Sequence, residues 1–468
     1  MTTIKFGTDG WRAIIADAFT FENVRVIAQA VSNYILSINH GERGLAISYD
    51  VRFLSQQFAR TMAEVISSNG IPVFLSQHFT PTPVLSFAVS QRQLAGGIMI
   101  TASHNPYYYN GVKFKGEYGG PAMIGLTQAI ENQLHRNQPR HDEALIQRNL
   151  HVVDFVQEYV LHLRRFLNWD LIHNFDAVMV YDAMHGAGCH VLHHLLSQAA
   201  GRLVRIRNMP DPMFGQALPE PIPKNLAPLM RAVVRHHAAV GLATDGDADR
   251  FGIVDSSGHF VDLHDLMPLL FSYLIESRHW SGDVVRTTSM ANTIDRLAAK
   301  HGRKVWEVPV GFKHVTETML ENNIMIGGEE SGGFGYRDHI PERDGILSCL
   351  LVVEMLAAKK QPIQEMVAQL RQEFGPFAYG RIDEYSQPEI MAANMAALRN
   401  SPPERIGDFV VDSVLLIDGI KFYFTDHSWM LIRVSQTEPL ARVYVAADCH
   451  DKVTSLLQQG VQLITRTR

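Results

Sequence analysis

The sequence predicts an α/β protein with three related α/β units, followed by a smaller α+β unit at the carboxyl end. Short apolar runs rich in β-branched residues alternate with segments of helical spacing, a pattern typical of largely parallel sheets. The order strand–helix–strand–helix–strand occurs three times. From Phe374 onward, alternating residues with aromatics and turn residues indicate antiparallel strands instead. A chain of 468 residues is long enough for three or four such domains.

The expected elements of the three units share one order. The first unit has a helix at 21–38 and strands at 45–49, 73–75 and 98–100. The second has strands at 177–181, 203–206 and 240–243, and the third at 284–287, 305–308 and 324–326. The repetition lies in the order of elements and not in residue identity.

The domain boundaries follow from changes in composition. The polar stretch 135–148 is expected to be an exposed connection, and the segment 255–259 (DSSGH) a turn. We therefore expect domains at 1–148, 149–256, 257–372 and 373–468, the last ending in a helix at 451–465.

Charge and cysteine content exclude several classes of protein. Lys and Arg number 42 against 48 Asp and Glu, and no basic run suits a nucleic-acid backbone, so no nucleic acid is expected as a partner. Three well-separated cysteines, Cys189, Cys349 and Cys449, are typical of reduced thiols in a cytoplasmic protein. No signal peptide is recognised at the N-terminus, and the longest apolar stretch, 266–275, is too short to span a membrane. The oligomeric state, monomer or dimer, stays open.

The first polar loop follows the third strand of the first unit. Ligands bind beyond the carboxyl ends of strands in open α/β sheets, and here the chain reads TASHNP. Asn105 and Pro106 form a turn that we expect to hold Ser103 out of the sheet, exposed and beside His104. A second turn would return Lys113 and Lys115 to the same region, where cations suit a phosphorylated serine. A capped strand end with no chemistry is the alternative.

The second polar loop carries three alternating carboxylates. In TDGDADR, Asp245, Asp247 and Asp249 can turn onto one hard cation, and all-oxygen ligation suits Mg²⁺. An EF-hand is excluded, because its sixth and twelfth positions would be Arg250 and Ser256. The alternative is a solvated acidic turn.

Two further loops carry groups that suit a sugar phosphate. GGEESGG places Glu329, Glu330 and Ser331 between glycines, where carboxylates and a hydroxyl suit sugar hydroxyl groups; a flexible acidic turn is the alternative. Upstream, VPVGFKHV offers Lys313 and His314. RVSQTEPLAR offers hydroxyl and guanidinium groups of the kind that grip a phosphate, although a solvated hairpin end explains them equally. Its candidate residues are Arg433, Ser435, Thr437 and Arg442.

Together these loops resemble the α-D-phosphohexomutase superfamily, which includes phosphoglucomutase, phosphomannomutase and phosphoglucosamine mutase. The resemblance covers the whole chain and rests on FGTDGWR, TASHNP, DGDADR, GEESGG and RVSQTEP. It implies three α/β domains with mixed sheets and a smaller fourth domain around a central cleft. It also implies an enzyme that interconverts hexose 1-phosphate and hexose 6-phosphate, with a hexose 1,6-bisphosphate as intermediate and activator.

The resemblance also assigns roles to residues. Ser103 would carry the phosphoryl group, and Asp245, Asp247 and Asp249 would hold one Mg²⁺ together with it. Lys113 is our first choice for general acid/base and His104 the second. The other implied contacts are to the sugar through Glu329 and Ser331, to the distal phosphate through Arg433, Ser435, Thr437 and Arg442, and along the cleft through Arg12, Arg250 and Lys313. Two positions depart from the family pattern, Gln436 and Ala446.

The substrate ranking rests on two loops. Glucosamine mutases usually carry Gln in the sugar loop and an Asp-Arg pair where this chain reads GFKHV, so glucose phosphate is ranked first, mannose phosphate second and glucosamine phosphate third. Two other classes stay open: a Mg²⁺-dependent sugar phosphatase and a non-catalytic sugar-phosphate binder.

Overall fold

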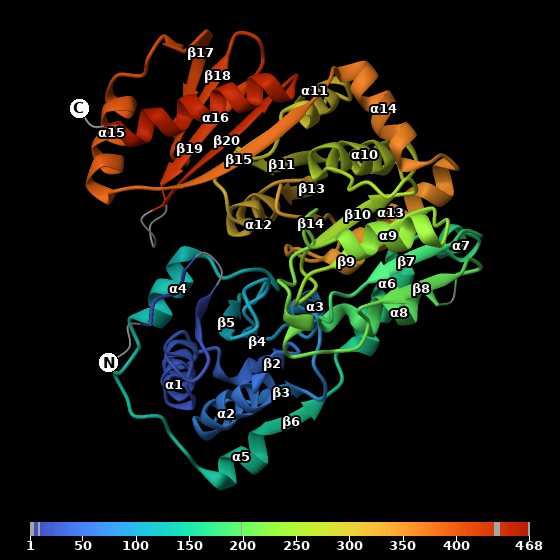
Figure 1. The fold of residues 1–468 in the computed structure, drawn as a ribbon. Coiled ribbons are helices and arrows are strands. Elements are labelled where there is room, and N and C mark those ends of the chain that lie inside the picture. The colour runs from blue at the N-terminus through green and yellow to red at the C-terminus, as the bar shows by residue number, and fades with distance from the viewer. Residues whose placement is uncertain (1–3, 8–9, 198, 435–439, 467–468) are drawn as a thin grey trace.

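A computed structural model describes residues 4–7, 10–197, 199–434 and 440–466 of the chain (Figure 1). These residues form four sheets, three mixed and one antiparallel. The predicted fold class is confirmed: three α/β units precede an antiparallel α+β unit. In the part of the chain described, we find no helix with the length and apolar character needed to cross a bilayer.

The first sheet contains the three predicted parallel strands and three that the sequence did not indicate. Its strand order is β1-β5-β4-β2-β3-β6, with β1 and β5 antiparallel to their neighbours. The strands are β1 (Trp11–Ile14), β2 (Leu45–Tyr49), β3 (Val73–Ser76), β4 (Gly96–Ile100), β5 (Tyr109–Lys115) and β6 (Leu150–Val153). The helices are α1 (Phe21–Ser37), α2 (Ser55–Ser68), α3 (Thr82–Gln91), α4 (Ile124–Glu131) and α5 (Glu143–Asn149).

One expectation about this unit needs correction. The stretch 135–148 is not a plain exposed connection, because α5 begins within it at Glu143, capped by the Asp142 carboxylate accepting from the Leu145 amide. The following strand, β6, pairs in parallel with β3. The first sheet therefore continues past residue 148.

The second and third sheets repeat the central arrangement of the first. Their orders are β10-β9-β7-β8 and β14-β13-β11-β12, matching β5-β4-β2-β3. The strands are β7 (Met179–Asp182), β8 (Leu203–Ile206), β9 (Val240–Thr244), β10 (Phe251–Asp255), β11 (Asp283–Thr287), β12 (Val305–Val308), β13 (Ile324–Glu329) and β14 (Gly333–Tyr336). The helices are α6 (Val156–Phe166), α7 (Trp169–His173), α8 (Val191–Leu196), α9 (Ala227–Arg235), α10 (Leu263–Glu276), α11 (Thr293–Lys300), α12 (Phe312–Glu321), α13 (Gly345–Lys359) and α14 (Ile363–Phe374).

This repeat explains where the three polar loops lie. In each unit the central parallel strand, β4, β9 or β13, is followed by an antiparallel return strand, β5, β10 or β14. TASHNP, the aspartate loop and GEESGG occupy or flank these three connections. The sequence located the loops but did not indicate the three return strands.

The fourth sheet is antiparallel throughout, with the order β15-β20-β19-β18-β17-β16. Its strands are β15 (Ala378–Tyr385), β16 (Arg405–Ile406), β17 (Phe409–Leu415), β18 (Ile420–Phe424), β19 (Trp429–Val434) and β20 (Leu440–Ala447). Two helices, α15 (Pro388–Asn400) and α16 (His450–Thr465), pack together beside it (Figure 1). The other face buries Trp429, Leu431 and Tyr444.

The second and third units share one core. Helix α13 is apolar on every side and crosses from the third unit to pack on β9 and β10 of the second. Its first residue, Gly345, lies against the aspartate loop: a Cβ at this position would be 2.4 Å from the carbonyl oxygen of Arg250. The helix therefore holds the aspartate loop in a fixed relation to the third sheet.

Candidate active site

Ser103 lies just beyond the end of β4, in the connection to β5. Its backbone has φ = 51°, a left-handed conformation that is unfavourable for a residue with a side chain. We expected this serine to be exposed, but it is only 1% exposed. Ser103 is buried because the aspartate loop of the second unit covers it.

The aspartate loop approaches Ser103 closely. The Ser103 hydroxyl donates to Asp245 Oδ2 at 3.1 Å. The approach requires glycine at 246, where a Cβ would be 2.6 Å from the Ser103 carbonyl oxygen. Two loops that are far apart in the sequence thus form one site.

The three aspartates are grouped as a metal site requires. Oxygen atoms of Asp245, Asp247 and Asp249 all lie within 4.8 Å of one another, and all three residues are fully buried. The Oδ1 atoms of Asp247 and Asp249 are buried without a hydrogen-bond partner. Buried orphan carboxylate oxygens are costly unless a cation is nearby, so this donor set fits a hard divalent cation such as Mg²⁺.

Lys113, on β5, lies among these carboxylates. Its Nζ forms ion pairs with Asp247 at 2.8 Å and Asp249 at 2.9 Å, and the side chain is buried. Both of these neighbours are anionic. Thr82, at the start of α3, also donates to Asp247 Oδ2 at 2.6 Å.

The carboxylates differ in their affinity for a proton. Burial and the neighbouring charges of Asp247 and Asp249 raise the pKa of Asp245 well above its ordinary value. Burial acts in the same direction on Asp247, but the Lys113 ammonium outweighs it and holds the pKa of that carboxyl below its ordinary value. Without a metal, Asp245 therefore favours its protonated form and Asp247 its ionised form.

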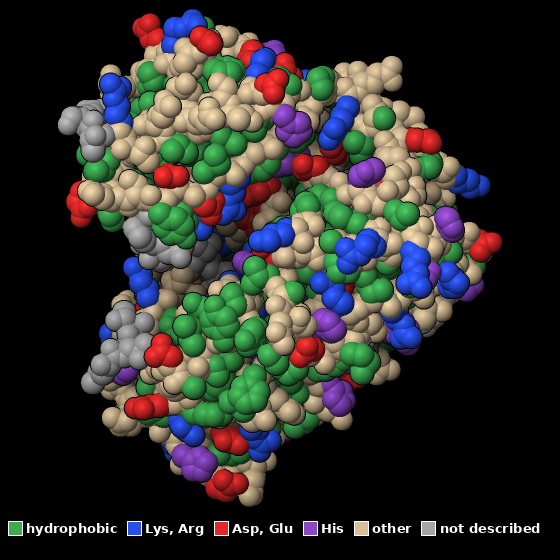
Figure 2. Space-filling view, in the orientation of Figure 1, with side chains coloured by type: hydrophobic (Ala, Val, Ile, Leu, Met, Phe, Trp, Pro, Cys, Tyr) green, Lys and Arg blue, Asp and Glu red, His purple; other side chains and the backbone are tan. Residues whose placement is uncertain are grey.

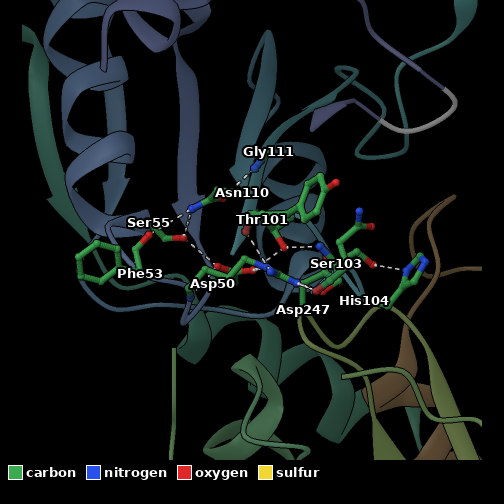
Figure 3. A network of polar contacts seen from close by, with 12 residues as sticks. Asp50, Phe53, Ser55, Thr101, Ser103, His104, Asn110, Gly111 and Asp247 are labelled. Carbon is green, nitrogen blue, oxygen red and sulfur yellow. Dashed lines mark hydrogen bonds and ion pairs between the residues drawn. The ribbon is translucent and has the colours of Figure 1, made fainter. Parts of the chain in front are cut away.

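His104 lies next to the serine hydroxyl. Its Nδ1 is 3.4 Å from Ser103 Oγ (Figure 3). Burial, followed by the charges of Arg250, Arg12 and Lys113, lowers the pKa of His104 well below 6.5. The imidazole is therefore neutral near pH 7 and able to accept a proton.

The glutamate loop joins the site through Arg343, a residue that the sequence reasoning missed. The Arg343 guanidinium pairs with Asp249 at 2.9 Å and lies 3.7 Å from Glu329. Glu329 also accepts from the Gly311 amide at 3.0 Å. Because burial outweighs Arg343, the pKa of Glu329 is raised to about 7. The available signal for Arg343 was a charged run, Glu342–Asp344, placed directly before an apolar helix.

Four other predicted residues lie in or near these loops. The Arg12 guanidinium donates to Asn105 Oδ1 in the serine loop at 2.6 Å, and the Arg250 amide donates to Asp245 Oδ1 at 3.1 Å. Lys313 lies in the first turn of α12 and Ser331 in the glutamate loop, both half-buried.

The predicted phosphate site lies on the fourth sheet and is only partly described. Arg433, on β19, pairs with Asp418 at 2.7 Å, and Arg442, on β20, pairs with Asp383 at 3.5 Å. Asp418 also accepts from the amide of Val310 in the third unit, at 2.8 Å. Ser435 and Thr437 lie outside the described residues.

The surface is hollowed between the first and fourth units. Figure 2 shows this hollow between the two halves of the molecule, with acidic and basic side chains inside it. The expected central cleft is therefore present, and opposite charges line it.

Comparisons with known proteins agree with this geometry. Family models described as phosphoglucomutase/phosphomannomutase, alpha/beta/alpha domains I, II and III, match residues 3–141, 157–258 and 262–374. A phosphoglucomutase/phosphomannomutase of Thermococcus kodakarensis is 29% identical over 98% of both chains. A protein of Methanothermobacter thermautotrophicus named "Probable phosphoglucosamine mutase" is also 29% identical, over 96% of this chain and 94% of its own.

A solved structure extends the agreement to the whole fold. A crystal structure from Thermus thermophilus, of a protein provisionally named phosphomannomutase, is 33% identical, covers 99% of this chain and 100% of its own, and superposes with a TM-score of 0.86. The chain belongs to the phosphoglucomutase/phosphomannomutase family, within the α-D-phosphohexomutase superfamily.

Proposed function

We propose that this protein is a phosphohexomutase that interconverts hexose 1-phosphate and hexose 6-phosphate through a phosphoserine at position 103. The observation that carries the proposal is the Ser103 hydroxyl, 3.1 Å from a carboxylate of a buried cluster of three aspartates. A serine placed against three carboxylates suits a phosphoryl group whose charge a shared cation offsets.

The transfer proceeds in two balanced steps. The bond between phosphorus and Ser103 Oγ breaks while a substrate hydroxyl forms a bond to the same phosphorus, and the hydroxyl proton passes to a base of the protein. The hexose 1,6-bisphosphate then turns within the cleft. Its other phosphoryl group returns to Ser103, and the protonated base supplies a proton to the oxygen left on the sugar.

The metal site belongs to the aspartate loop. Asp245, Asp247 and Asp249 would hold one Mg²⁺ together with the phosphorylated Ser103, since all four ligands are oxygens. When bound, the ion neutralises negative charge on the transferring group. Lys113 already places a positive charge between two of the carboxylates.

Two residues are candidates for moving the proton. We retain Lys113 as the first candidate, because it is buried beside the cluster, and His104 as the second, because it lies 3.4 Å from Ser103 Oγ with a lowered pKa. Either group lies at the end of β4 or on the adjacent β5, within the same wall of the site.

Sugar and distal phosphate would be bound by the other two loops. Glu329 and Ser331 would accept and donate hydrogen bonds to sugar hydroxyls, with Arg343 fixing the Glu329 carboxylate. Arg433, Ser435, Thr437 and Arg442 would grip the phosphate that is not transferred, and Arg12, Arg250 and Lys313 would line the path between them.

Glucose phosphate is the proposed preferred substrate, followed by mannose phosphate. The GEESGG and GFKHV loops support this order. Glucosamine phosphate is ranked third, although one of the two curated relatives described above is named as a phosphoglucosamine mutase. Comparing kcat/KM for the 1-phosphates of the three sugars decides among them; a clear preference for glucosamine 1-phosphate would reverse the order.

A phosphatase is the alternative from another class. It would pass the phosphoryl group from Ser103 to water and release inorganic phosphate. The burial of Ser103 favours transfer to a bound sugar, since a site closed to water disfavours hydrolysis.

The decisive experiment follows the phosphoryl group. The protein is incubated with glucose 1,6-bisphosphate and Mg²⁺, and intact mass is measured alongside hexose phosphate turnover and free phosphate. We expect one added phosphate, absent in Ser103→Ala, and hexose 6-phosphate as product. Release of phosphate without isomerisation would favour the phosphatase; turnover by Ser103→Ala at the wild-type rate would exclude both.

A further inference from the structure

A buried ion pair, Asp50–Arg52, lies directly behind the serine loop. Asp50 follows β2, and the two side chains are fully buried, with Arg52 Nε donating to Asp50 Oδ2 at 3.1 Å. Neither residue belongs to a motif that the sequence analysis singled out. Figure 3 shows Asp50 within the network of polar contacts that includes Thr101 and Ser103.

Arg52 holds the carbonyl side of the loop. An arginine has five N–H donors, and here one reaches Asp50 while the other four reach backbone carbonyls. The four acceptors are the carbonyl oxygens of Ser103 at 2.6 Å, Asn105 at 2.6 Å, Pro106 at 2.8 Å and Tyr109 at 3.0 Å. The first three belong to the connection between β4 and β5 and Tyr109 is the first residue of β5, so one side chain fixes the course of the whole loop.

Asp50 holds the amide side of the same loop. Its Oδ2 accepts from the Thr101 hydroxyl at 2.6 Å, and the Thr101 oxygen in turn accepts from the Ser103 amide at 2.9 Å. Its Oδ1 accepts from the Ser55 hydroxyl at 2.8 Å and the Arg52 amide at 2.9 Å. Both backbone polar groups of Ser103 are thus tied, directly or through Thr101, to one ion pair.

The ion pair is closed off from solvent by the second unit. The Arg52 guanidinium lies 4.8 Å from the centre of the Phe214 ring, and Phe214 is 1% exposed. Arg52 itself is 3% exposed. The contacts of Arg52 are therefore made in a setting where water cannot replace a lost donor.

These contacts have a consequence for the reaction because Ser103 adopts a left-handed backbone. Such a conformation persists in a residue with a side chain only where the surroundings impose it. The direction of the Ser103 hydroxyl toward Asp245 follows from that backbone, and a small misplacement of a reacting group costs rate steeply.

We infer that Asp50 and Arg52 are positioning residues of phosphoryl transfer, which orient the Ser103 hydroxyl by binding both its amide and its carbonyl. The inference rests on the proposed function, since it is the phosphorylation of Ser103 that the pair serves. Because both side chains are fully buried behind the loop, we expect the pair to act on the chemical step and to leave substrate binding unchanged. A lysine at position 52 cannot replace the arginine, because three donors cannot serve five acceptors.

The test compares Arg52→Met, Arg52→Lys and Thr101→Val with the wild-type protein. We expect kcat to fall by about 10²-fold in Arg52→Met, with KM within about threefold of wild type. Arg52→Lys should recover only a small part of that loss. In a single turnover with glucose 1,6-bisphosphate, intact mass should show phosphate added to Ser103 more slowly by the same factor.

Hydrogen exchange supplies a readout that does not depend on activity. Amides in the segment 99–110 should exchange faster in Arg52→Met than in the wild-type protein. The matched control is Arg278→Met, which removes an arginine paired with the buried Glu354 and packed on Phe166 and Trp280. Arg278→Met should leave kcat, the phosphorylation rate and exchange in 99–110 unchanged.

The outcomes separate this inference from the proposed function. If the wild-type protein takes no phosphate on Ser103, the proposed function fails. If the wild type is phosphorylated and a folded Arg52→Met matches it within threefold in kcat and phosphorylation rate, the positioning role is overturned. Should Arg52→Met not fold, Thr101→Val decides: a roughly tenfold loss of kcat at unchanged KM supports the inference, and an unchanged kcat overturns it.

Discussion

The Ser103 hydroxyl and the Asp245 carboxylate form a 3.1 Å hydrogen bond across 142 residues of sequence. The two groups lie in the loops that follow central strands of two different sheets, β4 and β9. Neither sheet alone would bury a serine against three carboxylates. The site therefore exists only when the first and second units are packed together.

Glu329 predicts the acid limb of the pH profile. Burial raises its pKa to about 7, and the ionised form is the one suited to accept hydrogen bonds from a sugar. We expect kcat/KM for hexose 1-phosphate to rise as pH increases through about 7, and Glu329→Gln to lower it and remove this limb.

The raised pKa of Glu329 makes stability fall with rising pH, whereas kcat/KM rises. A carboxyl with a raised pKa favours the folded state most below pH 4.5, and this contribution is lost as pH rises through about 7. Glu317→Gln, at an exposed position of α12, is the control and should keep the wild-type pH profile of kcat/KM. If the acid limb of the kcat/KM profile persists in Glu329→Gln, another group is responsible for that limb.

Arg343 predicts the affinity for a divalent cation. Its guanidinium lies 2.9 Å from Asp249, so it competes electrostatically with a cation at the same carboxylate. We expect Arg343→Met to bind Mn²⁺ about three- to tenfold more tightly, measured by calorimetry or electron paramagnetic resonance without substrate. The control, Arg337→Met, removes an arginine paired with Asp338 at the surface. Weaker binding of Mn²⁺ by Arg343→Met would show that the arginine organises the cluster instead.

Lys113 and His104 can be separated by substitution. If Lys113 moves the proton, Lys113→Met should lose about 10²–10⁴-fold in kcat, and Lys113→Arg should not recover it, because an arginine does not release its proton near pH 7. If only the charge beside Asp247 and Asp249 matters, Lys113→Arg should restore most of the activity. His104→Gln is measured in parallel, and a larger loss there than in Lys113→Met would assign proton transfer to the histidine.

Lys421 predicts how the stability of the interface between the third and fourth units depends on pH. This buried lysine donates to Glu307 at 2.7 Å and to the Thr288 carbonyl at 2.8 Å, and burial, followed by the charge of Arg286, lowers its pKa from 10.5 to about 7. Between these pH values the unfolded chain binds a proton that the folded protein does not. The free energy of unfolding should therefore gain on the order of 3 kcal/mol from this residue as pH rises from 7 to 10.

The measurement is the thermal midpoint of Lys421→Met relative to wild type at pH 6.5, 8 and 9.5. The thermal midpoint of Lys421→Met should fall relative to that of the wild type as pH rises, because the wild type loses its buried charge. Lys359→Met, which removes a partly exposed partner of Glu276, should show no such trend. A constant difference between Lys421→Met and wild type would mean that the lysine stays charged throughout.

Local pattern was enough to predict the central parallel strands and the polar loops that follow them. The strands 45–49, 203–206 and 305–308 match the structure residue for residue, since each is a short run rich in apolar residues, and the first is buried throughout. The serine and aspartate loops were found because strand ends, glycines and alternating carboxylates are short-range signals.

The sequence by itself determined the α/β repeat, the antiparallel last unit and the loops that carry the candidate reacting groups. Only the tertiary structure decided that Ser103 is buried, that Thr82 and Arg343 reach the aspartates, and that Asp50 and Arg52 hold the serine loop. The physical reason is that burial and hydrogen bonding between distant segments depend on how whole sheets pack, and no pattern within a few residues of Ser103 encodes which loop will cover it.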